Sequence, residues 1–583
     1  MNKEWSLDAL YKGFDDEKFT SDMQKLDSDI AEYDKFVDNC PKTKESLVKL
    51  VNINLDIAKL STTLMSYADL RQSVNTSDGE ATAAIGKISS MLAAASGANA
   101  KFVNLVASFE DLDGVINSDA LLKEHEFYLH NIKEKSKHTL SPDVESALSL
   151  YEISGSRAWS DLQGYLTSTL SVDYDGKKTN LSDIRNKAYD KDADVRRRAY
   201  DAEIAAYEKI KDSVAFSLNS LKLEVINRCK LRGYKSPLDE TLENSNMKRE
   251  TLDALMTAIG EYLPKFWEYL RAKAKLLGYD GALPWYDMFA PIEGNDREFT
   301  TEECRDYLVS LFAKFDKEES EMIREAFDNE WIDFFPHDGK VGGAFCADLH
   351  PIRQCRILTN YDGALGDVVT LAHELGHAFH ARCLTKNSIL NTDMSMQVAE
   401  TASTFNEVVA MNEIIKSETD KTAKRALIES QLMDAAQIIC DICSRYYFET
   451  EVFERRADEF LLSDELCKIM TNAQKRAYGN GLDEKTLHPY MWVCKSHYYI
   501  GGLSFYNFPY AFGGLFARGL YAKYLEDGEK FVPLYKELLR ATGVTSVEGA
   551  AKVAGIDVSD VNFWRSSLKI LSDEIDEFVK LCD

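Results

Sequence analysis

Hydrophobic positions recur with helical spacing in two neighbouring segments, near residue 370 and near residue 400. At about 100° per residue, four apolar side chains of the first segment fall on one side of a helix: Val368, Leu371, Leu375 and Phe379. The second segment carries an apolar stripe of the same kind: Val398, Ala402, Phe405 and Val409. We therefore expect two amphipathic helices, with a connection long enough for the second to run antiparallel to the first.

The rest of the chain is predicted to be mostly helical as well. Glycine, with 30 residues, and proline, with 11, are few for 583 residues, which favours long helices, such as Ala202–Asn227 and Lys248–Leu277. A hairpin turn is expected at Asp175-Gly176. Residues 342–346 and 355–361 are short and β-prone, so they predict a small β-element in an otherwise α-helical fold.

The length and composition predict more than one domain or lobe, because a chain that is 45% hydrophobic buries a large core. We assign residues 1–200 to an N-terminal helical region. Residues 201–583 form the second region, which contains both amphipathic helices.

The charge of the chain argues against nucleic acid as a partner. The formal net charge is −27, from 69 basic and 96 acidic residues, whereas phosphate contact requires clustered Lys and Arg, so nucleic-acid binding is not expected. The least polar stretch, Thr82–Phe109, is interrupted by Lys87 and Lys101 and is predicted to be an amphipathic helix, so no membrane association is expected. The first ten residues lack the apolar segment of a signal peptide, which predicts a cytoplasmic location.

The chemistry of the chain is indicated by His373-Glu374-Leu375-Gly376-His377. Two histidines four residues apart face the same side of a helix, so both imidazoles can reach one zinc ion. His380 falls on the same side. The glutamate between the two histidines can hold a water molecule that the metal activates. This pattern predicts a metal site with Glu374 as general base.

A catalytic zinc ion usually has three protein ligands, so a third is needed. A histidine ten residues after the first is one solution, but Cys383 occupies that position. The other solution is a glutamate on the following helix, where Glu400 and Glu407 share the face opposite the apolar stripe. We predict Glu400 as the third ligand and Glu407 as a residue that orients a ligand histidine.

Three segments give the chain a resemblance to a known family: Asn360–His377, Val398–Glu407 and Phe505–Gly513. They resemble the oligoendopeptidase F branch of the thimet oligopeptidase family of zinc metallopeptidases. The resemblance implies two helical lobes around a deep substrate channel, one zinc ion (Zn2+) per chain, and cleavage of short peptides. It places the zinc ligands at His373, His377 and Glu400 and the general base at Glu374.

The resemblance also implies a histidine and tyrosines from the C-terminal segment that close over the substrate. A tyrosine hydroxyl and an imidazole N–H can donate to the oxyanion that forms when water attacks an amide. Tyr510 and His497 match the family pattern best, and Tyr506 and Tyr499 are alternatives.

The β-prone segments suggest how a peptide is held. An extended peptide can add to an exposed strand edge through main-chain hydrogen bonds that are independent of its side chains. We expect Gly343 and Ala344 to contact substrate in this way. A small structural hairpin with no role in binding is the alternative.

The leading hypothesis is a zinc endopeptidase that hydrolyses internal bonds of short unfolded oligopeptides. An exopeptidase, acting as a carboxypeptidase or an aminopeptidase with the same zinc chemistry, is one alternative. A catalytically silent peptide-binding protein is the other. The oligomeric state is left open.

Overall fold

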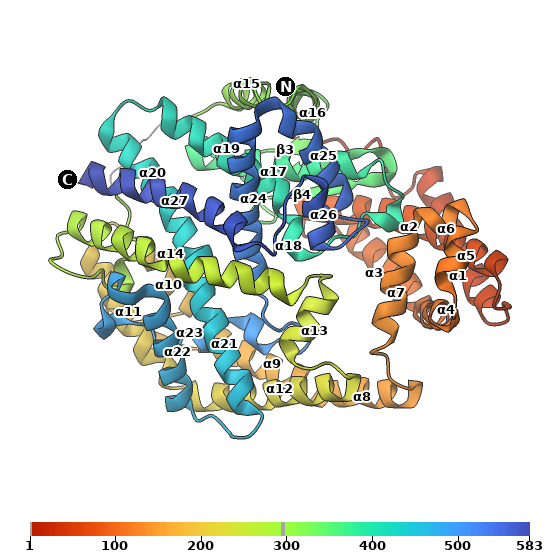
Figure 1. The fold of residues 1–583 in the computed structure, drawn as a ribbon, viewed down its shortest axis with the longest axis horizontal. Coiled ribbons are helices and arrows are strands. Elements are labelled where there is room, and N and C mark those ends of the chain that lie inside the picture. Colours follow the sequence, from red (N-terminus) through yellow and green to blue (C-terminus); the bar gives the residue numbers. More distant parts are fainter. Residues whose placement is uncertain (1–2, 293–297, 583) are drawn as a thin grey trace. The chain divides into compact units, whose positions relative to one another are not determined.

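The computed structural model describes residues 3–292 and 298–582. Within these residues the chain is mostly helical, with small sheets, as predicted (Figure 1). It divides into two compact units: unit 1 comprises Met1–Lys137, Asp296–Ala410 and Lys523–Ile556, and unit 2 comprises His138–Asn295, Met411–Ala522 and Asp557–Asp583. The division into regions 1–200 and 201–583 stays a prediction.

Unit 1 contains these helices: α1 (Glu17–Val37), α2 (Lys44–Val74), α3 (Gly79–Ala94), α4 (Ser96–Ser108), α5 (Leu112–Asn117), α6 (Ala120–Glu124), α7 (Glu126–Ser136), α15 (Thr301–Phe312), α16 (Lys317–Asp328), α17 (Leu365–Leu384), α18 (Met396–Ala399), α25 (Phe531–Ala541) and α26 (Val547–Val553). The stretch expected to form one helix at 82–109 is divided between α3 and α4. Two more helices, α19 (Thr401–Ser417) and α24 (Phe508–Asp527), begin in one unit and end in the other.

The small sheet of unit 1 has the strand order β3 (Ile332–Asp333), β5 (Gln354–Leu358), β4 (Phe345–Leu349). β5 pairs parallel with β3 and antiparallel with β4, so β4 lies at an edge. Both β-prone segments therefore form strands, as predicted. Leu349 and Leu358 join the hydrophobic core formed by the N-terminal helices, and α17 contacts both β4 and β5. The sheet thus links the N-terminal helices to α17.

Helix α17 buries the predicted apolar stripe: Val368, Leu371, Leu375 and Phe379 are all 1% exposed or less. Its N-terminal turn contains an acidic residue, Asp367, which accepts hydrogen bonds from the amides of Asp362 and Gly363 at 2.7 and 3.0 Å. The carboxylate therefore satisfies amides of the preceding loop, where negative charge is also favoured by the helix dipole. The loop that precedes α17 is thus held to Asp367 by two hydrogen bonds.

Unit 2 contains these helices: α8 (Pro142–Ser154), α9 (Ser156–Ser168), α10 (Leu181–Asn186), α11 (Ala193–Tyr207), α12 (Lys211–Arg232), α13 (Pro237–Asn244), α14 (Arg249–Leu276), α20 (Lys421–Ala436), α21 (Ile442–Arg456), α22 (Ser463–Tyr478), α23 (Met491–Cys494) and α27 (Val561–Cys582). Helix α14 agrees with the prediction for 248–277. The single helix expected at 202–227 is wrong, because the chain turns at residues 208–210 between α11 and α12.

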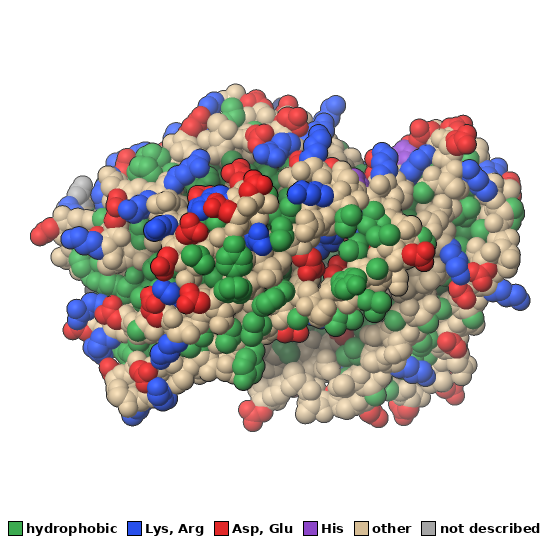
Figure 2. All heavy atoms as spheres, turned by 90° about the horizontal axis from the view of Figure 1, so that it is seen from below, with side chains coloured by type: hydrophobic (Ala, Val, Ile, Leu, Met, Phe, Trp, Pro, Cys, Tyr) green, Lys and Arg blue, Asp and Glu red, His purple; other side chains and the backbone are tan. Residues whose placement is uncertain are grey.

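The predicted hairpin of unit 2 is present, with β1 (Val172–Tyr174) paired antiparallel to β2 (Lys177–Thr179). Asp175 and Gly176 both have positive φ, 49° and 76°, as a two-residue turn of type I′ requires. Among the described helices, none has both the length and the apolar character that crossing a membrane demands. On the face shown in Figure 2, acidic and basic side chains are interspersed.

Candidate metal centre

The two amphipathic helices lie in close backbone contact at Gly376 of α17. A Cβ atom at this position would lie 2.5 Å from the carbonyl oxygen of Ala402 and 2.6 Å from the Cα of Ser403, both in the first turn of α19. Only glycine allows this contact, because the obstructing atoms belong to the backbone and cannot rotate away. The contact places Glu400, which ends α18 and directly precedes α19, beside the two histidines of α17.

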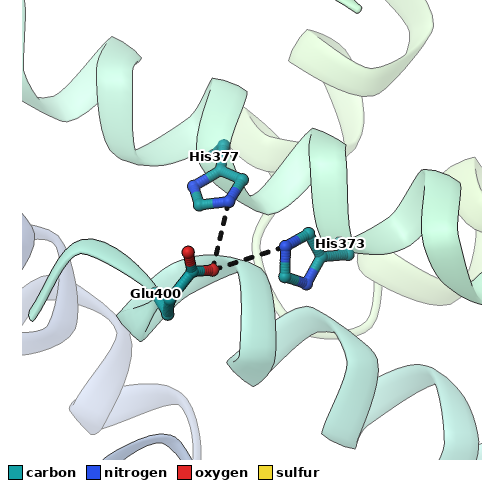
Figure 3. A group of neighbouring side chains, drawn as sticks. All are labelled: His373, His377 and Glu400. Atoms are coloured by element: carbon teal, nitrogen blue, oxygen red, sulfur yellow. Dashed lines mark ion pairs between the residues drawn. The ribbon is translucent and has the colours of Figure 1, made fainter. Parts of the chain in front are cut away.

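His373, His377 and Glu400 converge on one point (Figure 3). Oε2 of Glu400 lies 3.4 Å from Nε2 of His373 and 3.2 Å from Nε2 of His377. In a tetrahedral site with Zn–N and Zn–O bonds of about 2.0–2.1 Å, two ligand atoms lie about 3.3 Å apart. The donor set of two imidazoles and one carboxylate is also one that zinc prefers, so these residues fit a zinc ion.

Two further contacts hold the ligands in position. Nδ1 of His373 lies 2.8 Å from Oε1 of Glu407, so this ring nitrogen donates to the carboxylate and Nε2 is left to accept a metal. The hydroxyl of Ser403 donates to Oε2 of Glu400 at 2.8 Å. Glu407 therefore contacts His373, and its role in orienting a metal ligand stays a prediction.

The electrostatics of the cluster favour a bound cation. Burial acts to lower the pKa of His373, but the carboxylates of Glu400 and Glu407 outweigh it and raise the pKa to about 10. The pKa of Glu400 is lowered, because both histidines outweigh the opposing effect of burial. The carboxylates thus attract positive charge. Protons supply this charge in the absence of a metal, and a bound zinc ion would replace the protons.

Glu374 lies beside the cluster and is 5% exposed. Burial raises the pKa of this carboxyl, although the charges of His373 and His377 oppose the shift. A raised pKa makes the carboxylate a stronger base, which suits a group that takes a proton from water.

Asn406 is a site residue that the sequence analysis missed. Its Nδ2 donates to the carbonyl of Ala372, directly before His373, at 3.2 Å, and to Oε1 of Glu319 in α16 at 2.8 Å. This fully buried amide therefore fastens α19 to α17. The signal was a polar residue between the apolar Phe405 and the acidic Glu407, in a helix otherwise buried on that side.

His380 shares the histidine face of α17 but is not part of the cluster. Its Nε2 lies 2.9 Å from Oγ1 of Thr542 and 3.2 Å from the carbonyl of Leu539, both from the α25 region of unit 1. The ring is buried, and burial lowers its pKa to about 4. Cys383, at the position of the alternative third ligand, is buried too.

The C-terminal segment lies in unit 2 and is held by a hydrogen-bond chain. Nδ2 of Asn507 donates to Nε2 of His497 at 2.7 Å, and Nη1 of Arg445 donates to Oδ1 of Asn507 at 2.9 Å. Burial, followed by the charge of Arg445, lowers the pKa of His497 to about 3, so the ring is neutral with a proton on Nδ1. The hydroxyls of Tyr506 and Tyr510 contact each other.

Two of the predicted tyrosines differ sharply in exposure. Tyr510 is 37% exposed, whereas Tyr499 is fully buried and donates to the carbonyl of Trp492 at 2.9 Å. Tyr499 is therefore a core residue of unit 2, and we do not retain it as a substrate contact.

The comparison with family models covers most of the chain. Residues 187–570 match the model of peptidase family M3, and residues 106–171 match that of oligopeptidase F. The chain belongs to peptidase family M3. It is therefore a metallopeptidase, and the resemblance to oligoendopeptidase F noted in the sequence is confirmed.

Some relatives of this M3 peptidase match almost its whole length. Oligopeptidase PepF of Bacillus subtilis is 23% identical, over 99% of this chain and 87% of its own length. A peptidase structure from Chlamydophila abortus superimposes with a TM-score of 0.88 at 20% identity, covering 99% of this chain and 98% of that one. Oligoendopeptidase F from Enterococcus faecium gives 0.71 at 18% identity, with 97% and 98% covered. These structural matches establish the shared fold.

The two residues predicted to contact a peptide, Gly343 and Ala344, directly precede the edge strand β4. Asn360 donates from Nδ2 to the carbonyls of Val341 and Gly343 at 3.0 and 2.8 Å, which fixes this segment against the loop after β5. Gly343 has a φ of 81°, a left-handed conformation that glycine adopts without strain. Gly343 and Ala344 thus lead into β4, the edge strand of the sheet formed by the described residues, and their contact with a peptide stays a prediction.

Proposed function

We propose that the chain is a zinc-dependent endopeptidase that hydrolyses internal peptide bonds of short, unfolded oligopeptides. One zinc ion is held by His373, His377 and Glu400. The observation that carries the proposal is the cluster of three ligand atoms, in which Oε2 of Glu400 lies at zinc-like distances from both histidines, with the buried carboxylate of Glu374 beside it. That the chain is a peptidase follows from its family.

A bound zinc ion supplies Lewis-acid chemistry, since it makes a water molecule more acidic and polarises a substrate carbonyl. Glu374 takes a proton from the attacking water as the new C–O bond forms. The same carboxyl then gives that proton to the amide nitrogen as the C–N bond breaks. The raised pKa of Glu374 supports both transfers, because the group must gain and lose a proton near neutral pH.

The donors to the oxyanion are proposed to come from the C-terminal segment. Tyr510 is exposed and can donate its hydroxyl, and Tyr506 contacts it. His497 is neutral, with Nε2 accepting from Asn507, so its Nδ1–H is the proton it can donate. The peptide is proposed to extend along β4, with Gly343 and Ala344 at the start of the strand.

Two alternatives, an exopeptidase and a catalytically silent peptide-binding protein, can be distinguished by experiment. An exopeptidase needs a charged group that holds a chain terminus, and a silent binding protein keeps peptide affinity without turnover. The intact set of His373, Glu374, His377 and Glu400 favours an active enzyme. The cytoplasmic location stays a prediction of the sequence.

The decisive experiment uses an internally quenched peptide, about ten residues long and blocked at both ends. Wild type, Glu374→Gln and chelator-treated wild type are compared, and fragments are identified by mass spectrometry. We expect internal cleavage by wild type alone, with zinc retained in Glu374→Gln. Trimming of an unblocked peptide only would favour the exopeptidase, and no cleavage despite bound zinc would favour the binding protein.

A further inference from the structure

Unit 2 contains a cavity of about 520 Å³ that has no part in the proposed zinc chemistry. It is bounded by α10, α11, the turn at Trp285–Phe289, the C-terminal end of α20 and residues 488–495. All of its lining residues belong to unit 2. A volume of this size accommodates a small organic ligand or a short peptide end.

The most deeply buried charges of the cavity wall are already neutralised within the protein. Nε of Arg196 donates to Oδ1 of Asp287 at 2.6 Å, and its Nη1 donates to the carbonyl of Asp190 at 2.6 Å. Asp441 accepts a hydrogen bond from Arg445. These pairs give the cavity a rigid polar wall, but they leave no charge for a ligand to balance.

Lys495 is different, because its ammonium group makes no hydrogen bond or ion pair with any residue in the described ranges 3–292 and 298–582. The side chain is half-buried and lines the cavity. Burial, followed by the charge of Arg445, lowers the pKa of Lys495, although the carboxylate of Asp441 opposes the shift. A cation in such surroundings gains stability when an anion comes beside it.

Arg185 supplies a second cation to the same cavity. Its Nε lies 3.4 Å from Oε1 of Glu203, and its side chain is 38% exposed. The Oε1 atom of Glu203 also accepts from the hydroxyl of Tyr207 at 3.0 Å, so its negative charge is shared. Arg185 is therefore only partly neutralised and presents a planar donor group suited to a carboxylate.

Several aromatic rings also line the cavity, together with methionines, His488 and the carboxylate of Asp434. Tyr200 and Tyr286 lie with ring centroids 5.7 Å apart, and Tyr189 and Phe289 with centroids 5.1 Å apart. Trp285 completes this group. Aromatic rings beside a pair of cations match a ligand that has an apolar side chain next to a carboxylate.

We propose that this cavity binds the C-terminal end of a short peptide, with its α-carboxylate at Lys495 and Arg185 and an apolar side chain against the aromatic wall. The proposal draws on the peptidase function only in expecting such peptides to be present. The same chemistry is offered by the end of a bound substrate and by a released product.

A hydrogen-bond chain connects the cavity with the proposed oxyanion donors. Asp441, in the cavity wall, accepts from Arg445; Arg445 donates to Asn507; and Asn507 donates to His497. Asp441 also ends a π-helical turn, Gln437–Asp441, a distortion that is frequent at functional sites. The cavity wall and His497 thereby belong to one hydrogen-bonded network.

The test uses calorimetric titration of zinc-free protein with N-acetyl-phenylalanyl-leucine and with its C-terminal amide. We expect the acid to bind about tenfold or more tightly than the amide, because only the acid forms charge-assisted hydrogen bonds. Lys495→Met and Arg185→Gln should each abolish this preference. Lys468→Met, at an exposed lysine that does not line the cavity, should retain it.

Equal affinity of the wild-type protein for the acid and the amide would overturn the proposal. So would a Lys495→Met variant that has the wild-type melting temperature and still prefers the acid. Because the titration needs neither zinc nor turnover, failure of the peptidase assay leaves its result intact. The two sources are then separated with zinc-loaded enzyme. A preference in kcat/KM for substrates with a free C-terminus, lost in Lys495→Met, identifies the substrate end, whereas inhibition by the acid with no such preference identifies the product.

Discussion

Replacing Gly376 with alanine tests whether the close contact of α17 and α19 creates the proposed zinc site. The new Cβ would lie 2.5 Å from the carbonyl oxygen of Ala402. A carbon–oxygen contact of this kind is normally about 3.3 Å or longer, so α19 must retreat by roughly 0.8 Å. Neither helix can avoid this shift by changing a rotamer, because the obstructing atoms belong to the backbone.

The shift acts directly on the metal site. Glu400 immediately precedes α19, and metal–ligand distances tolerate only about 0.2 Å of variation. We expect Gly376→Ala to weaken zinc binding on the order of 10–100-fold, comparable to losing a group that orients a metal ligand. Overpacking of the helix contact should also destabilise the zinc-free protein by about 1–3 kcal/mol.

The same helix provides a matched control. A Cβ at Gly366 of α17 would meet nothing within 4 Å, so Gly366→Ala makes the same chemical change without the clash. Zinc affinity is measured by competition with a fluorescent chelator, and stability by thermal unfolding of the zinc-free variants. If Gly376→Ala matched Gly366→Ala in both measurements, the close contact would not be what positions Glu400.

Other predictions address single contacts. Glu407→Ala should weaken zinc binding about 10–100-fold in the same competition assay, and Glu407→Gln less, because an amide oxygen still accepts from His373. Tyr510→Phe should lower kcat with unchanged zinc content, whereas Tyr499→Phe should leave kcat/KM unchanged and cost about 1 kcal/mol in urea unfolding. Burial raises the pKa of Glu319 to about 8, so the native state holds this proton more tightly than the unfolded state. The contribution of the protonated Glu319 to the free energy of unfolding is complete below about pH 4.5 and is lost as pH rises through about 8. Glu319→Gln should therefore flatten the decline in stability that denaturant titrations measure from pH 5 to 9.

Helical periodicity is what made the cluster of His373, His377 and Glu400 predictable. The four-residue spacing of His373 and His377 fixes both on one face of any α-helix, whatever the surrounding fold. The apolar stripe of the next segment predicted which side Glu400 faces, although the helix is interrupted there and Glu400 lies between α18 and α19. Three side chains from two elements could therefore be expected to meet, and the structure brings them together. The small sheet and the Asp175-Gly176 hairpin follow from equally local signals.

Helical periodicity did not reveal which residues of a polar helix face are exposed and which are covered by other elements. His380 shares the face of His377, yet α25, more than a hundred residues later in the chain, encloses it and uses it as a core hydrogen-bonding residue. Tyr499 and Tyr510 come from the same segment but differ in burial. The turn that separates α11 from α12 also lacks the glycine or proline that usually marks a break. Each of these outcomes depends on tertiary contacts between distant segments.

The proposed roles fall into two groups that biochemical measurements can separate. The zinc ligands, the general base and Glu407 all belong to unit 1, whereas the proposed oxyanion donors and the cavity with Lys495 belong to unit 2. Substitutions of the unit 1 ligands should therefore change zinc affinity and turnover together. Substitutions at Tyr510 or Lys495 should change kinetic constants while the zinc affinity stays that of wild type. A unit 2 variant that lost zinc in proportion to its activity would contradict this division of roles.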